Sequence, residues 1–128
     1  MKVTQTTIAV RVRYAECDPM NVVHHSVYPI WFELARTELL REQGGVYREM
    51  EQAGVFCVVA RLNVRYRRPV RYDDELTVHV KALPGGGVKI EHAYEVRRGT
   101  ELLTTAETTL VCVDSDGKLR PVPDALAM

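Results

Sequence analysis

Residues 14–36 read YAECDPMNVVHHSVYPIWFELAR, and this stretch leads from a strand through a polar loop into a long helix. Apolar residues in its second half and just beyond it recur at three- and four-residue spacing, which indicates one buried helix face. They are Val27, Ile30, Trp31, Leu34, Ala35 and Leu39. Proline is tolerated only in the first turn of a helix, so Pro29 predicts a helix start near His25 and Ser26. Gly44 and Gly45 predict its end.

The rest of the chain alternates apolar and polar residues with period two, which is typical of half-buried strands. Strands are expected near residues 8–14, 61–67, 76–81, 88–97 and 102–113, and a short second helix near 47–52. The turns that separate the last three strands are short. These strands should therefore form an antiparallel meander, with the final strand near the sheet centre. The elements predict an α+β fold in which one long helix packs on one face of a five-stranded sheet.

Charge and composition exclude several classes of partner. The chain has 17 Lys and Arg and 17 Asp and Glu, so its net charge is zero, and neither nucleic acid nor an anionic membrane is expected as a partner. No apolar run approaches the ~20 residues that span a bilayer, and the first residues lack a signal-peptide pattern. We expect one cytoplasmic domain over residues 1–128. Its sheet would have two open edges, so at least a dimer is expected.

The loop before the helix carries residue types that can do chemistry. A carboxylate such as Asp18 can act as a base or a nucleophile, although Asp-Pro also begins turns. Asn21 either bends the chain through a positive φ or is simply a polar loop residue. His24 and His25 are adjacent and point different ways. With Cys17 and Asp18 they match no metal-binding spacing, so no metal site is expected, and His24 is interpreted as solvated.

The backbone at the helix start adds a second chemical group. The first turn of a helix exposes N–H groups without partners and carries a partial positive charge. Such an end can polarise a carbonyl or hold an oxyanion. One loop would bring these amides to Asp18, and the combination would make an acyl-transfer site.

Basic residues gather on the strand near 61–67 and at its exit. They are Arg61, Arg65, Arg67, Arg68 and Arg71. Arginine binds two phosphate oxygens at once, so a phosphorylated small molecule is one interpretation of this cluster. A solvated or subunit-contacting sheet face is the other, because alternation places Arg61, Arg65 and Arg67 on one face. Three acidic residues at 73–75 weaken the positive field of the cluster. The chain has no net positive charge, so RNA or DNA binding is not expected.

Two blocks of the sequence form motifs. The first comprises Tyr14, Glu16, Asp18, Val23, His25, Tyr28, Glu33 and Arg36–Glu38. The second runs Val64-Arg65-Tyr66-x-Arg68-Pro69-x-x-x-Asp73-Asp74-Glu75-Leu76. In this order they resemble the 4-hydroxybenzoyl-CoA thioesterase-like family, and within it the acyl-CoA thioesterases associated with the Tol–Pal system. The resemblance covers nearly the whole chain.

The resemblance implies a hotdog fold, in which a curved antiparallel sheet wraps one long helix. It also implies a homodimer or homotetramer that hydrolyses an acyl-CoA at its subunit interfaces. We expect the acyl group to be small to medium in size. Asp18 would be catalytic as nucleophile or general base, while the His25 amide polarises the thioester carbonyl and the His25 imidazole takes part. Coenzyme A enters as part of the substrate, so no cofactor is expected. The residues expected to contact the substrate are Asn21, Val23, Tyr28, Arg65, Arg67 and Arg68.

Three positions depart from the family pattern. Asn21 stands where glycine is usual, His24 stands where an aromatic residue is more common, and Pro29 lies within the helix region. Because asparagine tolerates positive φ, the first departure is compatible with the bend. Pro29 affects the expected position of the His25 amide more than the role of Asp18.

Two other functions are compatible with the same fold. One is a protein that holds acyl-CoA without cleaving it. The other is a hydratase or dehydratase, whose chemistry needs a histidine and a carboxylate facing the substrate. His25 with Asp18 or Glu33 would supply those groups.

Overall fold

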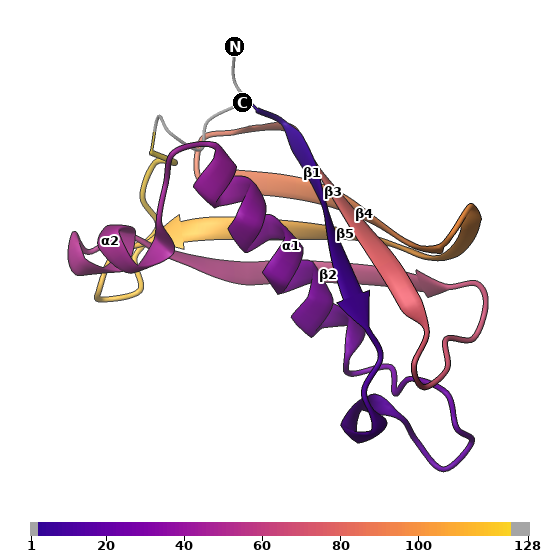
Figure 1. Cartoon of the computed structure of the whole chain (residues 1–128). Helices are drawn as coiled ribbons and strands as arrows, with labels where there is room; N and C mark the ends of the chain where they lie inside the picture. The colour runs from indigo at the N-terminus through magenta and orange to yellow at the C-terminus, as the bar shows by residue number, and fades with distance from the viewer. Residues whose placement is uncertain (1–2, 124–128) are drawn as a thin grey trace.

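A computed structural model describes residues 3–123, and Figure 1 shows a curved sheet lying along one long helix. The strands are β1 (Gln5–Arg11), β2 (Phe56–Tyr66), β3 (Glu75–Gly86), β4 (Lys89–Arg98) and β5 (Glu101–Val113). The helices are α1 (Tyr28–Glu42), the short α2 (Tyr47–Gln52) and the 3-10 turn η1 (Tyr14–Glu16). No helix within residues 3–123 is long and apolar enough to cross a bilayer. The predicted α+β hotdog fold is confirmed.

The five strands form one antiparallel sheet in the order β1-β3-β4-β5-β2. The last three strands form the predicted meander, because their connections are short. β5 is an interior strand between β4 and β2, and β4 is the middle strand. The two edges, β1 and β2, each have a row of backbone groups that no strand within residues 3–123 pairs.

The core lies between α1 and the inner face of the sheet. Of the predicted stripe, α1 buries Trp31, Ala35 and Leu39, whereas Ile30 and Leu34 are 55% and 48% exposed. Phe32, which the stripe did not include, is also fully buried. Burial of such a side chain stabilises the fold by about 1.5–3 kcal/mol. The Phe32 ring stacks on Tyr94 of β4 with 4.6 Å between ring centroids. These contacts fix α1, and therefore its first turn, against the sheet.

The start of α1 lies later in the chain than predicted. α1 begins at Tyr28 with Pro29 in its first turn, and residues 25–27 form a separate turn. A helix that began at His25 would need the Pro29 nitrogen to donate to the His25 carbonyl, and proline has no N–H. The Tyr66 hydroxyl donates to that carbonyl instead, at 2.9 Å.

Candidate active site

The chain between η1 and α1 places Asp18 at the start of a tight loop. The Asp18 N–H donates to the Val22 carbonyl at 2.8 Å, and the Asn21 N–H donates to the Asp18 carbonyl at 2.9 Å. Asn21 has φ at 67°, so of its two interpretations the bend through a positive φ is the one that the structure shows. The buried Val23 donates its N–H to the Val70 carbonyl at 2.8 Å. This bond ties the loop to the segment between β2 and β3.

The two oxygens of the Asp18 carboxylate have different surroundings. Oδ1 accepts hydrogen bonds from the N–H groups of Met20 at 2.8 Å and Val22 at 3.4 Å, a turn that Asp-Pro favours. Oδ2 accepts no hydrogen bond from any group within residues 3–123. One oxygen therefore holds the loop, and the other is available for chemistry.

The same loop occurs a second time, after β5. The Asp114 N–H donates to the Lys118 carbonyl at 2.8 Å, and Asp114 Oδ1 accepts from the N–H groups of Asp116 at 2.9 Å and Lys118 at 3.0 Å. Gly117, with φ at 81°, takes the place that Asn21 has in the first loop. The loop by itself is therefore a structural device, and what distinguishes Asp18 is its surroundings.

The turn before α1 leaves one backbone donor free. The His24 carbonyl accepts the Val27 N–H at 3.0 Å, and the Ser26 N–H donates to His24 Nδ1 at 3.1 Å. No group within residues 3–123 accepts a hydrogen bond from the His25 N–H. The C=O and N–H of a trans peptide point in opposite directions, so this N–H points away from α1. It is a donor of the kind that stabilises an oxyanion.

Tyr66, at the end of β2, joins this turn to the sheet. Besides its hydrogen bond to the His25 carbonyl, its ring meets the Tyr28 ring edge-on with 4.9 Å between centroids. Burial raises the pKa of Tyr28 to about 12, so this phenol stays neutral at physiological pH. Sequence reasoning assigned Tyr66 no role, because alternation grouped it with the apolar face of its strand. Its place in the second motif block was the only signal.

A cavity of about 380 Å³ brings these groups together. Its walls come from the loop between η1 and α1 (residues 17–27, the junction loop), the first turn of α1 and the segment after β2. The lining residues are Asp18, Val22, Val23, His25, Tyr28, Tyr66, Arg67, Arg68, Pro69 and Val70. Of the site residues expected from the sequence, only Asn21 and Arg65 do not line it. Asp18, the residue with the free N–H and two arginines thus line one cavity, which suits acyl chemistry on an anionic substrate.

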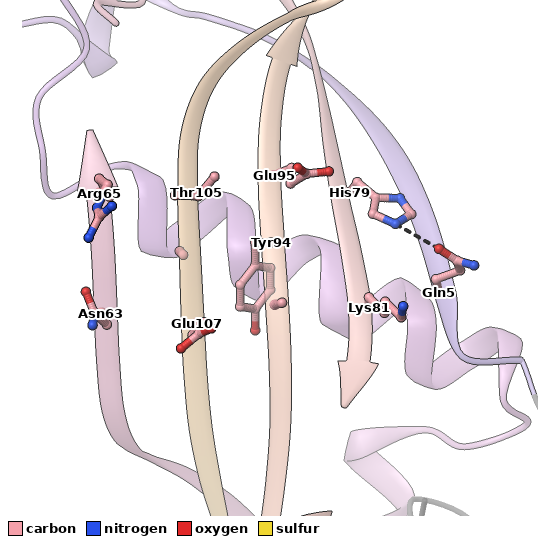
Figure 2. Close-up of a pocket in the computed structure, with 11 residues that line it drawn as sticks. Gln5, Asn63, Arg65, His79, Lys81, Tyr94, Glu95, Thr105 and Glu107 are labelled. Carbon is pink, nitrogen blue, oxygen red and sulfur yellow. Dashed lines mark hydrogen bonds between the residues drawn. The ribbon is translucent and has the colours of Figure 1, made fainter. Parts of the chain in front are cut away.

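Arg65 lies on the outer face of the sheet, apart from that cavity. Figure 2 shows it beside a separate hollow of about 640 Å³. β2 ends at Tyr66, and the N–H groups of Arg67 and Arg68 both donate to the Leu103 carbonyl, at 2.9 and 3.0 Å. The chain therefore turns away after Tyr66. The shared face that alternation predicts for Arg65 and Arg67 is wrong for this reason.

The larger hollow on the outer face is a weaker candidate for the reaction. It lies over the outer face of the sheet, and neither Asp18 nor His25 is among its lining residues. His79 in this hollow is held by Thr7 at 2.8 Å and Gln5 at 3.0 Å. Within residues 3–123, no three His, Cys, Asp or Glu side chains gather closely enough to hold a metal ion, in either hollow or elsewhere.

Known proteins resemble this chain in sequence and in structure. The thioesterase-like superfamily model matches residues 12–128. The acyl-CoA thioester hydrolase YbgC of Escherichia coli O6:H1 is 34% identical over 106 residues, which cover 82% of this chain and 79% of that protein. The acyl-CoA thioesterase YbgC of Haemophilus influenzae is 34% identical over 114 residues, covering 88% and 83%. A DHNA-CoA thioesterase structure from Staphylococcus aureus has TM-score 0.86 at 31% identity, covering 92% of this chain and 79% of that one.

The curved sheet around one helix, with a carboxylate and a free amide beside one cavity, defines a hotdog-fold protein suited to acyl chemistry. The chain belongs to the thioesterase-like superfamily. By that membership and by its named relatives it is a thioester hydrolase.

Proposed function

We propose that the protein is an acyl-CoA thioesterase that hydrolyses its substrate to a free acid and CoA, with Asp18 and the His25 amide as its reactive groups. One observation carries this proposal. The cavity holds Asp18, with Oδ2 available, beside a turn whose His25 N–H has no acceptor within residues 3–123. A general base and an oxyanion donor beside the same cavity are the two groups that acyl transfer to water requires.

The reaction follows from these two groups. The His25 N–H donates to the thioester carbonyl oxygen and stabilises the negative charge that develops there. Asp18 takes a proton from water, whose oxygen attacks the carbonyl carbon. The carbon–sulfur bond then breaks, and the CoA thiolate leaves with the proton from Asp18. Direct attack by Asp18 would instead form an anhydride that water hydrolyses. The His25 imidazole is proposed to assist beside its amide.

The arginines of the cavity suit the phosphates of CoA. Arg67 and Arg68 are both exposed and line the hollow that holds Asp18. Arg68 Nε also lies 3.5 Å from a carboxylate oxygen of Glu101, and the two form an exposed ion pair. Such a pair contributes little to stability, so Arg68 can exchange Glu101 for a phosphate of CoA. Arg65 lies on another face of its own subunit, so its proposed contact with CoA would be made across a subunit boundary.

The acyl group and the cellular setting are proposed more broadly. A cavity of about 380 Å³ is at the small end of ligand pockets, which favours a small-to-medium acyl group. Val23 and Tyr28 would contact it from the buried side. The two motif blocks support the branch of the family associated with the Tol–Pal system. A single cytoplasmic domain that acts as a homodimer or homotetramer is proposed on the same grounds.

Asp18→Asn tests the assignment, with Asp114→Asn as its matched control. Both changes replace a carboxylate that accepts loop N–H groups, so both make the same structural perturbation. Asp18→Asn should lower kcat at least ~100-fold, measured as thiol release from a panel of aromatic, short, medium and long acyl-CoAs. Asp114→Asn should keep the wild-type rate. A wild-type rate of thiol release by Asp18→Asn would contradict the assignment of Asp18 as the catalytic carboxylate.

The same assay separates the two rival functions. Tight binding of acyl-CoA by the wild-type protein, with no thiol release from any member of the panel, would favour a protein that only holds acyl-CoA. Formation of a double bond from a 3-hydroxyacyl thioester would favour the dehydratase.

A further inference from the structure

The peptide between His25 and Ser26 is held at both of its polar atoms. Its carbonyl oxygen accepts the Tyr66 hydroxyl at 2.9 Å, and its N–H donates to His24 Nδ1 at 3.1 Å. The two side chains come from different places, since Tyr66 ends β2 and His24 lies in the junction loop. The proposed chemistry gives neither side chain a task of its own.

The hydrogen bonds of His24 define its role. A backbone N–H can only donate, so Nδ1 is the acceptor, and the neutral imidazole carries its proton on Nε2. The Ser26 hydroxyl, 2.7 Å from the same Nδ1, then donates to it as well. The His24 backbone N–H donates to the Glu16 carbonyl at 2.9 Å, and the His24 and His25 rings lie 4.1 Å apart. His24 is exposed, as expected, but its side chain has defined partners.

These contacts limit how the turn can move. The free His25 N–H belongs to the peptide just before the held one, and the two planes share only the His25 Cα. The carbonyl of that earlier peptide is itself held by the Val27 N–H at 3.0 Å. Both planes are therefore fixed, and so is the direction of the free donor. An oxyanion donor acts only when it is aimed in advance, and a misplacement of about 1 Å can cost 10²-fold in rate.

We propose that His24 and Tyr66 are positioning residues that together aim the His25 N–H at the thioester carbonyl. This inference rests on the proposed thioesterase function. At position 24 it requires a side-chain acceptor for the N–H two residues ahead. Asparagine provides that acceptor in an Asx turn, whereas phenylalanine cannot.

Kinetics of His24→Phe, His24→Asn and Tyr66→Phe test the proposal. His24→Phe and Tyr66→Phe should each lower kcat about tenfold or more with little change in KM, because transition-state stabilisation is lost. His24→Asn should recover most of the wild-type kcat. The double variant with both phenylalanines should lose less than the product of the single losses, because both side chains hold the same peptide.

Two kinetic outcomes would overturn the proposal while the thioesterase function stands. One is wild-type kcat in both phenylalanine variants. The other is a His24→Asn variant as slow as His24→Phe, which would show that an acceptor at position 24 is not what matters. A wild-type protein that cleaves no acyl-CoA would overturn the proposed function, and the aiming role with it.

Amide hydrogen exchange tests the hydrogen bond without catalysis. The Ser26 N–H should exchange faster in His24→Phe than in the wild type, and His24→Asn should restore its protection. The His25 N–H, which has no acceptor within residues 3–123, should exchange readily in all three proteins. Equal Ser26 exchange in the wild type and His24→Phe would show that His24 does not hold this peptide.

Discussion

Asn21 reverses the chain between Asp18 and Val22 with φ at 67°, a conformation that strains most residues other than glycine and β-branched residues above all. Gly117 takes the equivalent place in the loop after β5, so this loop accepts glycine. Asn21→Gly should therefore keep kcat and change the free energy of unfolding by less than about 1 kcal/mol. Asn21→Val should lower that free energy by about 1–2 kcal/mol and reduce kcat, because Asp18 is displaced. Urea unfolding and thiol-release kinetics measure both effects, and indistinguishable variants would contradict the role of the bend.

At the scale of elements, β4 packs His92 under α1, where it is 6% exposed. Burial lowers the pKa of His92 to about 4, and the Arg36 guanidinium on α1 adds to this shift. In the unfolded chain this side chain has its ordinary pKa of 6.5. Between pH 6.5 and 4 the unfolded state therefore binds more protons, and stability falls as the pH falls through this window. The full loss is about 3 kcal/mol at most.

Urea unfolding between pH 7 and pH 4.5 measures this effect in the wild type and in His92→Phe. The variant has no titrating group at this position, so its stability should fall less steeply over the window. Carboxylates titrate in both proteins over this range. The contribution of His92 is therefore measured by the difference between the two curves of stability against pH. Parallel curves would show that His92 does not contribute.

At the scale of the whole molecule, apolar surface gathers along the edge strand β2 and the neighbouring face of α1. Val59 and Leu62 on β2 are 49% and 41% exposed, and Ile30 on α1 is 55% exposed. The three residues line one groove of about 170 Å³. An open strand edge with apolar neighbours favours pairing with a second copy. Tyr66 lies on the same strand, so a partner there would adjoin the candidate site.

Sedimentation velocity tests this expectation. The wild type should sediment as a dimer or tetramer, and Leu62→Lys should shift it toward the monomer. Leu119→Lys is the control, because Leu119 is also exposed, at 63%, but does not line this groove. A wild type that is monomeric at micromolar concentration would contradict the predicted oligomer.

The sequence by itself determined those features that depend on residues close together in the chain. The period of α1, the alternation of the strands and the short turns of the meander are local patterns, and they were enough for the α+β class. The bend at Asn21 is local too, because it depends on one residue's tolerance of positive φ. The hotdog fold and the choice of Asp18 as the catalytic residue came from the family resemblance of the two motif blocks. Periodicity and turn patterns alone did not specify either.

Only the tertiary structure decided the direction of the His25 amide, the task of Tyr66 and the separation of Arg65 from Arg67. The Tyr66 hydroxyl and the His25 carbonyl are 41 residues apart in the chain, so no local period relates them. Their contact exists because α1 packs on the sheet and brings its first turn to the end of β2. The missing N–H of Pro29 left the His25 carbonyl open, and that distant contact satisfied it.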